Sequence, residues 1–240
     1  MRSFSVIIVL FLLSSCGHAD SNSLTKAHLK GKVKSITEWE YDSLGRVVTQ
    51  IINSYDQNGN NVEGNLFSMG NHIRSVSTYD WKNRCTQSIF YRNNKLSDNG
   101  VYKYDNRNNR TESYTTSPDG KTNIVTRYKY RYNENDKPIE KREYSLPGEL
   151  RGFSAYKYDA NGNQIEITAF KIDSTIIKKI NATYDSSGNC IEVASYNWNT
   201  EEIIATYQYE NYDKAGNWQK MTKFEDGKIV GIKERKIEYY

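Results

Sequence analysis

Histidine and cysteine are scarce in this chain, with three of each among 240 residues. No two histidines have a spacing suited to zinc, and the sequence holds no Cys-x-x-Cys pair. It also lacks a Gly-x-Ser-x-Gly motif, a phosphate-binding loop and a dinucleotide-binding fingerprint. These absences predict a protein without a metal, without a cofactor and without catalytic residues of a familiar kind.

Apolar residues are also few, at 37% of the chain, whereas tyrosine alone supplies 20 residues. We therefore expect a core that is aromatic and partly polar. The net charge of +4 comes from 33 basic and 29 acidic residues scattered along the chain. Because a nucleic-acid-binding protein concentrates its basic residues in a patch or stripe, we expect no nucleic-acid partner.

The longest apolar stretch lies at the N-terminus, from Phe4 to Leu13. It is too short to span a bilayer, which takes about 20 residues, and it has the layout of a secretory signal. The sequence Leu13-Ser14-Ser15-Cys16 at its end resembles the bacterial lipobox. That resemblance implies cleavage before Cys16, lipidation of its thiol, and a lipid anchor in the bacterial cell envelope, at the outer membrane. The alternative is an ordinary signal peptide that is cut nearby, with Cys16 incidental.

The chain then divides into three parts. We predict a lipoprotein signal peptide over residues 1–15, a lipidated tether over residues 16–25, and one β-repeat domain over residues 26–240.

A tyrosine recurs about every 26 residues, in most copies followed by Asp and then by a turn that holds Gly or Asn. The equivalent tyrosines are Tyr41, Tyr79, Tyr104, Tyr132, Tyr158, Tyr184, Tyr212 and Tyr239. A second aromatic residue follows each of the first seven after 10 to 14 residues, so each repeat has room for two strands and two turns. A fixed period of this size is typical of a stacked β-repeat array.

The turns support antiparallel hairpins. Asp at the first turn position can accept a hydrogen bond from the backbone two residues on, and Gly162, Gly188 and Gly216 should close their turns at positive φ. Asn83 and Asn108 stand where other copies have Gly, and Asn also tolerates positive φ.

These signals predict an all-β antiparallel meander of about 15 strands. Because open twisted sheets rarely exceed about ten strands without curling, we expect an open, barrel-like sheet. The first gap between repeat tyrosines is oversized, at 38 residues, and predicts an inserted loop around residues 64–71.

Strand alternation predicts the two faces of the sheet. One face should be aromatic and form a possible binding surface made of Trp39, Tyr41, Tyr102, Tyr104, Tyr130, Tyr132, Tyr156 and Tyr158. The opposite face should carry a column of glutamates, Glu112, Glu140, Glu166 and Glu192. The tyrosines could stack on sugar rings or could instead be the core of a thin sheet.

Cys85 and Cys190 occupy equivalent positions, each six residues after a repeat tyrosine. Four repeats separate them, so in an open sheet they lie too far apart to pair. A disulfide between them would require the sheet to close.

The Tyr-x-Tyr-Asp sequences, such as Tyr102-Lys103-Tyr104-Asp105 and Tyr156-Lys157-Tyr158-Asp159, resemble the YD repeat of the RHS family. Large RHS proteins wrap such repeats into a shell around a cargo. This chain is far too short to enclose one and is more similar to small YD-repeat lipoproteins of Bacteroidetes-type bacteria. That resemblance implies a location in the cell envelope and implies no reaction.

Three functions are compatible with the sequence. The leading hypothesis is a non-enzymatic envelope lipoprotein that is held to the membrane by its lipid and binds a glycan or protein partner. The second is a glycan hydrolase that uses paired repeat glutamates, since such enzymes need two carboxyls about 5 to 10 Å apart. The third is a purely structural spacer of the envelope.

Overall fold

The computed structural model describes Ser23 and residues 28–120, 122–145, 148–197 and 203–240. The described residues form sixteen strands, which are, in chain order, β1 (Val33–Tyr41), β2 (Val47–Tyr55), β3 (Asn61–Ser68), β4 (Asn71–Tyr79), β5 (Cys85–Arg92), β6 (Lys95–Tyr104), β7 (Arg110–Thr116), β8 (Thr122–Tyr132), β9 (Pro138–Tyr144), β10 (Leu150–Tyr158), β11 (Gln164–Phe170), β12 (Ile176–Tyr184), β13 (Cys190–Asn197), β14 (Ile203–Glu210), β15 (Lys220–Glu225) and β16 (Lys228–Tyr239).

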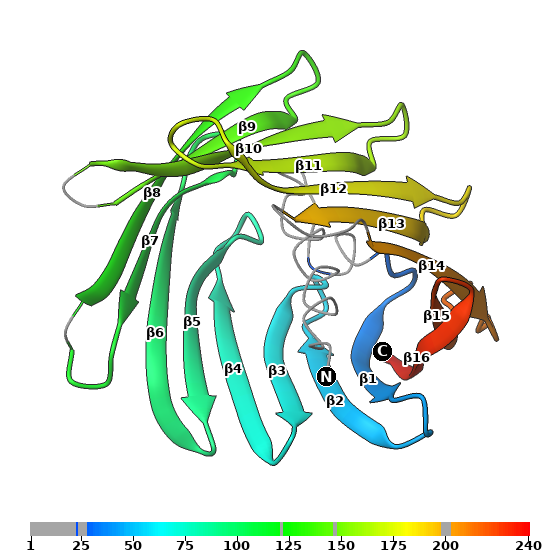
Figure 1. Ribbon diagram of the computed structural model, residues 1–240. Coiled ribbons are helices and arrows are strands. Elements are labelled where there is room, and N and C mark those ends of the chain that lie inside the picture. The colour runs from blue at the N-terminus through cyan, green and yellow to red at the C-terminus, as the bar shows by residue number, and fades with distance from the viewer. Residues whose placement is uncertain (1–22, 24–27, 121, 146–147, 198–202) are drawn as a thin grey trace.

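The strands form a closed barrel (Figure 1). Each strand pairs antiparallel with the next along the chain, and β16 pairs with β1 from Tyr239 opposite Val33 to Ile232 opposite Tyr41. The predicted all-β antiparallel meander is confirmed, whereas the predicted open sheet of about 15 strands is wrong. Closure satisfies the two strand edges that an open sheet would leave unpaired. Since every strand and interstrand pair lies within residues 33–239, a chain of residues 20–240 carries the complete barrel.

The predicted inserted loop is also wrong. Residues 64–71 belong to an ordinary hairpin, made of β3, a turn at Met69-Gly70 and β4. The first interval looks oversized because Tyr55-Asp56, not Tyr41-Asp42, is in phase with the later copies. The Tyr55-Asp56 turn lies at the same end of the barrel as the turns that follow Tyr79 and Tyr104, whereas the Tyr41-Asp42 turn lies at the other end.

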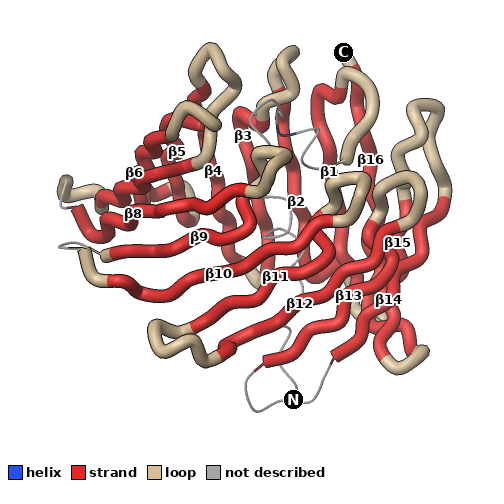
Figure 2. Tube along the Cα trace, turned by 90° about the horizontal axis from the view of Figure 1, so that it is seen from above, coloured by secondary structure: helices blue, strands red, loops and turns tan. Residues whose placement is uncertain are grey.

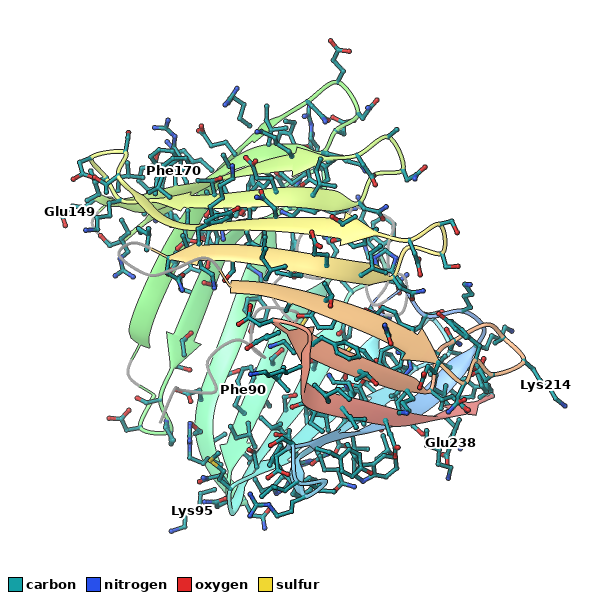
Figure 3. The ribbon with its side chains drawn as sticks, turned by 45° about the vertical axis from the view of Figure 1, so that its right-hand side comes forward. Phe90, Lys95, Glu149, Phe170, Lys214 and Glu238 are labelled. Carbon is teal, nitrogen blue, oxygen red and sulfur yellow. The ribbon has the colours of Figure 1, made fainter. Side chains whose placement is uncertain are left out.

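The barrel therefore has two different ends. The first, the aspartate rim, holds the seven turns 56–60, 80–84, 105–109, 133–137, 159–163, 185–189 and 213–217. The second, the loop rim, holds the connections that follow the odd-numbered strands, beginning with turn 42–46. Both chain ends of the barrel meet at the aspartate rim, because Tyr239 pairs with Val33 there (Figure 2). Lys95 and Glu149 mark the loop rim and Lys214 marks the aspartate rim (Figure 3).

The aspartate turns share one geometry, which the turn at Asp185 illustrates. The Asp185 carboxylate accepts hydrogen bonds from the backbone N–H groups of Ser187 at 2.8 Å and Asn189 at 2.9 Å. Gly188 closes the turn by donating to the Asp185 carbonyl at 3.0 Å, with φ at 81°. The predicted positive φ is thus confirmed at Gly188, and also at Gly162 and Gly216, with values of 87° and 80°.

Tyrosines at or near the ends of most even-numbered strands tie a hairpin to the one before it through a hydrogen bond that we call the tyrosine clamp. The Tyr184 hydroxyl donates to the Gln164 carbonyl at 3.1 Å, and Gln164 is the first residue after the preceding aspartate turn. The same bond joins Tyr79 to Asn61, Tyr104 to Cys85, Tyr158 to Pro138 and Tyr209 to Cys190. These carbonyls lie at the start of a strand where the register shifts, so the hydroxyl supplies a partner that the irregular pairing does not.

Side chains alternate between a buried face and an exposed face along the strands. On β14, for example, Ala205 and Tyr207 are buried, whereas Ile204, Thr206 and Gln208 are exposed. Because side chains crowd together on the concave side of a closed sheet, the buried face is the inner wall of the barrel. Its main apolar cluster lies on β12 to β15 and contains Ile180, Ala182, Cys190, Val193, Ala205, Tyr207 and Met221.

The two cysteines in the described part of the chain are free thiols on β5 and β13. Seven strands lie between them on either path around the wall, so even the closed barrel does not pair them. Their local environments match, as the repeat predicts, since the thiols of Cys85 and Cys190 each bond the carbonyl two residues on at 3.4 Å. Burial raises the pKa of Cys190 to about 11, so this thiol is not reactive at neutral pH.

Candidate functional site

The barrel splits the predicted aromatic face between its two walls. Six of its members lie on the inner wall, namely Tyr102, Tyr104, Tyr130, Tyr132, Tyr156 and Tyr158. Trp39 and Tyr41 lie on the outer wall, so their place on that face was predicted wrongly. The reason is the phase of the first repeat: Trp39 pairs with Gln50 and Glu234, and the inner positions of β1 are Glu38 and Glu40.

The inner wall of β8 carries three tyrosines in a row. The ring of Tyr130 lies 6.5 Å from that of Tyr128 and 6.1 Å from that of Tyr132, measured between centroids. Two cations lie against this row, and each is in an ion pair. Lys141 lies 5.4 Å from the Tyr128 ring and pairs with Glu143 at 2.7 Å, and Arg107 lies 4.6 Å from the Tyr132 ring and pairs with Asp136 at 3.0 Å. Aromatic faces among polar and charged groups suit a flat, polar ligand.

Arg110, at the start of β7, is the clearest departure from the repeat on this wall. Its guanidinium lies 4.0 Å from the centroid of the Tyr102 ring, and its buried Nε has no hydrogen-bond partner in the described part of the chain. The neighbouring tyrosine clamp changes at the same place, since Tyr132 donates to the Asp105 carboxylate at 2.8 Å instead of to the Arg110 carbonyl. Burial and this bond raise the pKa of Tyr132.

A second polar side chain without a partner lies on the same side of the barrel. Gln164 is 7% exposed, and neither its Oε1 nor its Nε2 has a hydrogen-bond partner among the described residues. It pairs across the sheet with Tyr158, one of the inner tyrosines. A buried amide or guanidinium N–H without a partner is costly, so both groups are positions where a bound molecule could supply one.

The seam between β1 and β16 holds a separate cluster of inner charges. Lys233 Nζ lies 3.0 Å from Glu40 Oε1 and 3.8 Å from Glu38 Oε2. Burial opposes the charge on Lys233, but the two carboxylates outweigh it and hold the pKa of Lys233 above its ordinary value. Arg235 lies over the Trp218 ring at 3.6 Å, and burial lowers its pKa to about 10. Since these charges pair with one another across β1 and β16, the cluster stabilises the strand pairing that closes the barrel.

The predicted glutamate column lies on the outer wall, and three of its members form ion pairs, all but one of them across strands. Glu112 pairs with Lys103 and Arg127, Glu140 with Arg131 and Arg142, and Glu166 with Lys157 and Lys179, at distances from 2.8 to 3.3 Å.

These ion pairs do not suit acid catalysis. The Tyr114 and Lys103 hydrogen bonds lower the pKa of Glu112, and the Arg142 hydrogen bond lowers that of Glu140. A glycosidase acid needs its pKa raised, so the surroundings of these glutamates act in the wrong direction.

Sequence reasoning missed Arg110, Gln164 and the seam charges, although a signal for Arg110 was present. At the first position after the seven aspartate turns, the other repeats have uncharged residues: Asn61, Cys85, Pro138, Gln164, Cys190 and Trp218. The seam charges are a second departure from the repeat, because Glu38, Glu40, Lys233 and Arg235 bring two acidic and two basic side chains together at inner positions of adjacent strands.

The described residues contain no group of His, Cys, Asp and Glu side chains able to hold a metal ion. They also contain no helix long and apolar enough to cross a membrane. Cys16, the signal peptide and all of the tether except Ser23 lie outside the described residues.

Comparison with solved structures identifies the architecture. The crystal structure of a porin-like protein from Bacteroides uniformis resembles this chain with a TM-score of 0.55, over 87% of this chain and 99% of that one, at 12% sequence identity. The fold is porin-like. Two further structures, TcdB2-TccC3-Cdc42 and TcdB2-TccC3-TEV, match 82% of this chain and 14% of theirs, with a TM-score of 0.31 and 13% and 14% identity. No family model and no curated protein matches the chain.

Proposed function

We propose that this protein is a lipid-anchored barrel of the bacterial cell envelope that binds an acidic glycan, without catalysis, on its inner wall. The observation that carries the proposal is the inner wall of β6 to β11, which holds a row of tyrosines and two buried groups without a hydrogen-bond partner among the described residues, the Nε of Arg110 and the side-chain amide of Gln164. Tyrosine faces stack on sugar rings, Arg110 would receive a carboxylate or sulfate, and Gln164 would bond a hydroxyl.

The outer wall favours water, not lipid, as its surroundings. Barrels that span the outer membrane present an outward apolar band about 25 Å tall. Here the outer wall carries the Lys103–Glu112–Arg127 series and two similar series on β8 to β12, and a charge facing lipid at mid-membrane costs about 2–4 kcal/mol. We therefore propose attachment through lipid on Cys16, with the barrel outside the bilayer.

Binding can be tested with residues 20–240 on a glycan array, followed by titration of the glycans retained. Tyr130→Ala should weaken binding about tenfold or more by removing the central ring of the row. Arg110→Gln should weaken binding of acidic glycans and leave neutral ones unaffected. Trp39→Ala, which removes an aromatic ring of the outer wall, is the matched control and should bind like the wild type.

Two outcomes would contradict the proposal. One is equal loss of binding in Trp39→Ala and Tyr130→Ala. The other is an array without binding, combined with a pull-down that retains an envelope protein through the inner wall.

The anchor is tested separately in cells. Metabolic labelling with a palmitate analogue should tag the wild type and the Cys85→Ser control but not Cys16→Ser. Label that persists in Cys16→Ser would exclude lipidation at Cys16.

A further inference from the structure

The loop rim differs from the aspartate rim in the side chains at its tips. Five of its hairpins expose a large apolar side chain: Leu44 is 74% exposed, Met69 81%, Leu96 46%, Ile172 63% and Ile229 51%. On the aspartate rim the exposed large apolar side chains are aromatic, at Trp81 and Tyr212 in the turns and at Tyr239 and Tyr240 at the chain end. Exposed aliphatic side chains spaced around one end of a barrel are more than the scattered apolar residues of an ordinary surface.

Basic residues accompany these apolar tips. Four loop-rim hairpins place a basic residue directly before an exposed aliphatic one, in the pairs Arg46-Val47, Lys95-Leu96, Lys171-Ile172 and Lys228-Ile229. Four acidic residues, Asp42, Asp173, Glu225 and Asp226, lie on the same hairpins, and Asp42 forms an ion pair with Arg46 at 2.6 Å. Apolar side chains beside Lys and Arg are the combination with which peripheral proteins meet a bilayer, because the aliphatic part enters the interface while the cation meets lipid phosphate.

We infer that the loop rim docks on a lipid bilayer that contains anionic lipid. The tips belong to connections that all lie at one end of the closed barrel, so several can touch one flat surface together. The charged outer wall then stays in water, and the apolar tips alone enter the interface. This inference does not depend on glycan binding or on lipidation of Cys16.

The chain before Ser23 is long enough to let an anchored barrel dock in this way. Ser23 accepts a hydrogen bond from the Asn61 N–H at 3.0 Å, which places it at the aspartate rim. A strand of nine residues rises about 30 Å, and with the tilt of about 40° usual in barrels it spans about 23 Å of wall height. Seven extended residues, from Cys16 to Ser23, reach about 25 Å, so an anchor at Cys16 can lie level with the loop rim.

The test is sedimentation of residues 20–240 with vesicles of phosphatidylcholine and phosphatidylglycerol, compared with vesicles of phosphatidylcholine alone. The triple variant Leu44→Ser, Met69→Asn and Ile172→Ser removes three apolar tips from turns. We expect its partition into the mixed vesicles to fall about a hundredfold, because each tip loses part of its apolar burial. Trp81→Ser combined with Tyr212→Ser removes comparable apolar surface from the aspartate rim and should bind like the wild type. Binding to phosphatidylcholine alone should be weaker throughout.

The inference is overturned if the wild type does not sediment with the mixed vesicles, or if the triple variant and the aspartate-rim control lose binding equally. A wild type that ignores vesicles but forms a dimer that the triple variant abolishes would make the loop rim a protein interface. Circular dichroism and melting of each variant show that the barrel is intact, so lost binding is not confused with lost fold.

Discussion

The tyrosine hydroxyl has a structural role that the repeat alone does not reveal. Near the end of the chain, two tyrosines are candidates for the bond to the preceding hairpin. Tyr212 has the repeat spacing and precedes Asp213, but its side chain is 49% exposed. Tyr209, three residues earlier, is partly buried against the main apolar cluster and donates to the Cys190 carbonyl at 2.6 Å. The clamp therefore depends on which side chain the strand turns inward, and not on the Tyr-Asp sequence.

We predict that Tyr209→Phe destabilises the barrel by about 1–2 kcal/mol, because it removes a buried hydrogen bond and leaves the Cys190 carbonyl without that partner. Tyr212→Phe should change the free energy of unfolding by less than about 0.5 kcal/mol, as expected for an exposed hydroxyl. Urea unfolding followed by tyrosine and tryptophan fluorescence measures both. Equal decreases in the free energy of unfolding of the two variants would show that the Tyr209 hydrogen bond does not stabilise the barrel.

At the scale of the hairpin, the turns were readable from sequence because their requirements are local. Asn83 and Asn108, predicted to replace Gly, have φ of 57° and 60°. Gly45 offers the cleanest test of this conformation, with φ of 73° and no atom within 4 Å of the position that a Cβ would occupy. At Gly188 a Cβ would lie 3.2 Å from His28 Nδ1, which would mix a steric effect with the backbone effect.

Gly45→Val should therefore cost about 1–3 kcal/mol, because it forces a β-branched residue to positive φ. Gly45→Asn should cost clearly less, since Asn tolerates that region. Thermal melting of both variants gives the comparison. If Val and Asn lowered the melting temperature by the same amount, the strain at this turn would not be conformational.

The phase of the first repeat could not be read from sequence in the same way. Tyr41-Asp42 and Tyr55-Asp56 both form aspartate turns, with the Asp42 and Asp56 carboxylates accepting equivalent backbone hydrogen bonds. Turn chemistry therefore does not distinguish them, whereas the interval of 24 residues from Tyr55 to Tyr79 and the position of each hairpin in the barrel do. For this reason Trp39 and Tyr41 lie on the outer wall, apart from the tyrosines of β6, β8 and β10 with which the sequence grouped them.

At the scale of the whole molecule, the repeat pattern does not predict that the sheet closes into a barrel. Fifteen of the sixteen strand pairings join neighbours along the chain, and the last joins its two ends. That last pairing depends on residues outside the repeat pattern, in particular Lys233 between Glu38 and Glu40. Because the repeat pattern does not include these residues, it predicts the antiparallel sheet but not the pairing of β1 with β16 that closes it.

We predict that Lys233→Met destabilises the barrel by about 3–5 kcal/mol, because it leaves buried carboxylates without their cation. Hydrogen exchange should show β1 and β16 losing protection before the other strands. Lys236→Met is the control: its ion pair with Glu238, at 2.9 Å on the outer wall, is exposed and should contribute less than about 1 kcal/mol. Uniform loss of protection around the barrel would show that the seam is no weaker than the rest of the wall.

The seam also bears on how the chain avoids joining the wrong partner while it folds. Until β16 has emerged during synthesis, β1 is a free edge, and free edges are templates on which chains aggregate. The inward charges of β1 are acidic at Glu38 and Glu40, and those of β16 are basic at Lys233 and Arg235. If two nascent chains met through β1, their carboxylates would lie together and repel each other. The free edge of β1 therefore disfavours pairing with β1 of a second chain and favours pairing with β16 of the same chain.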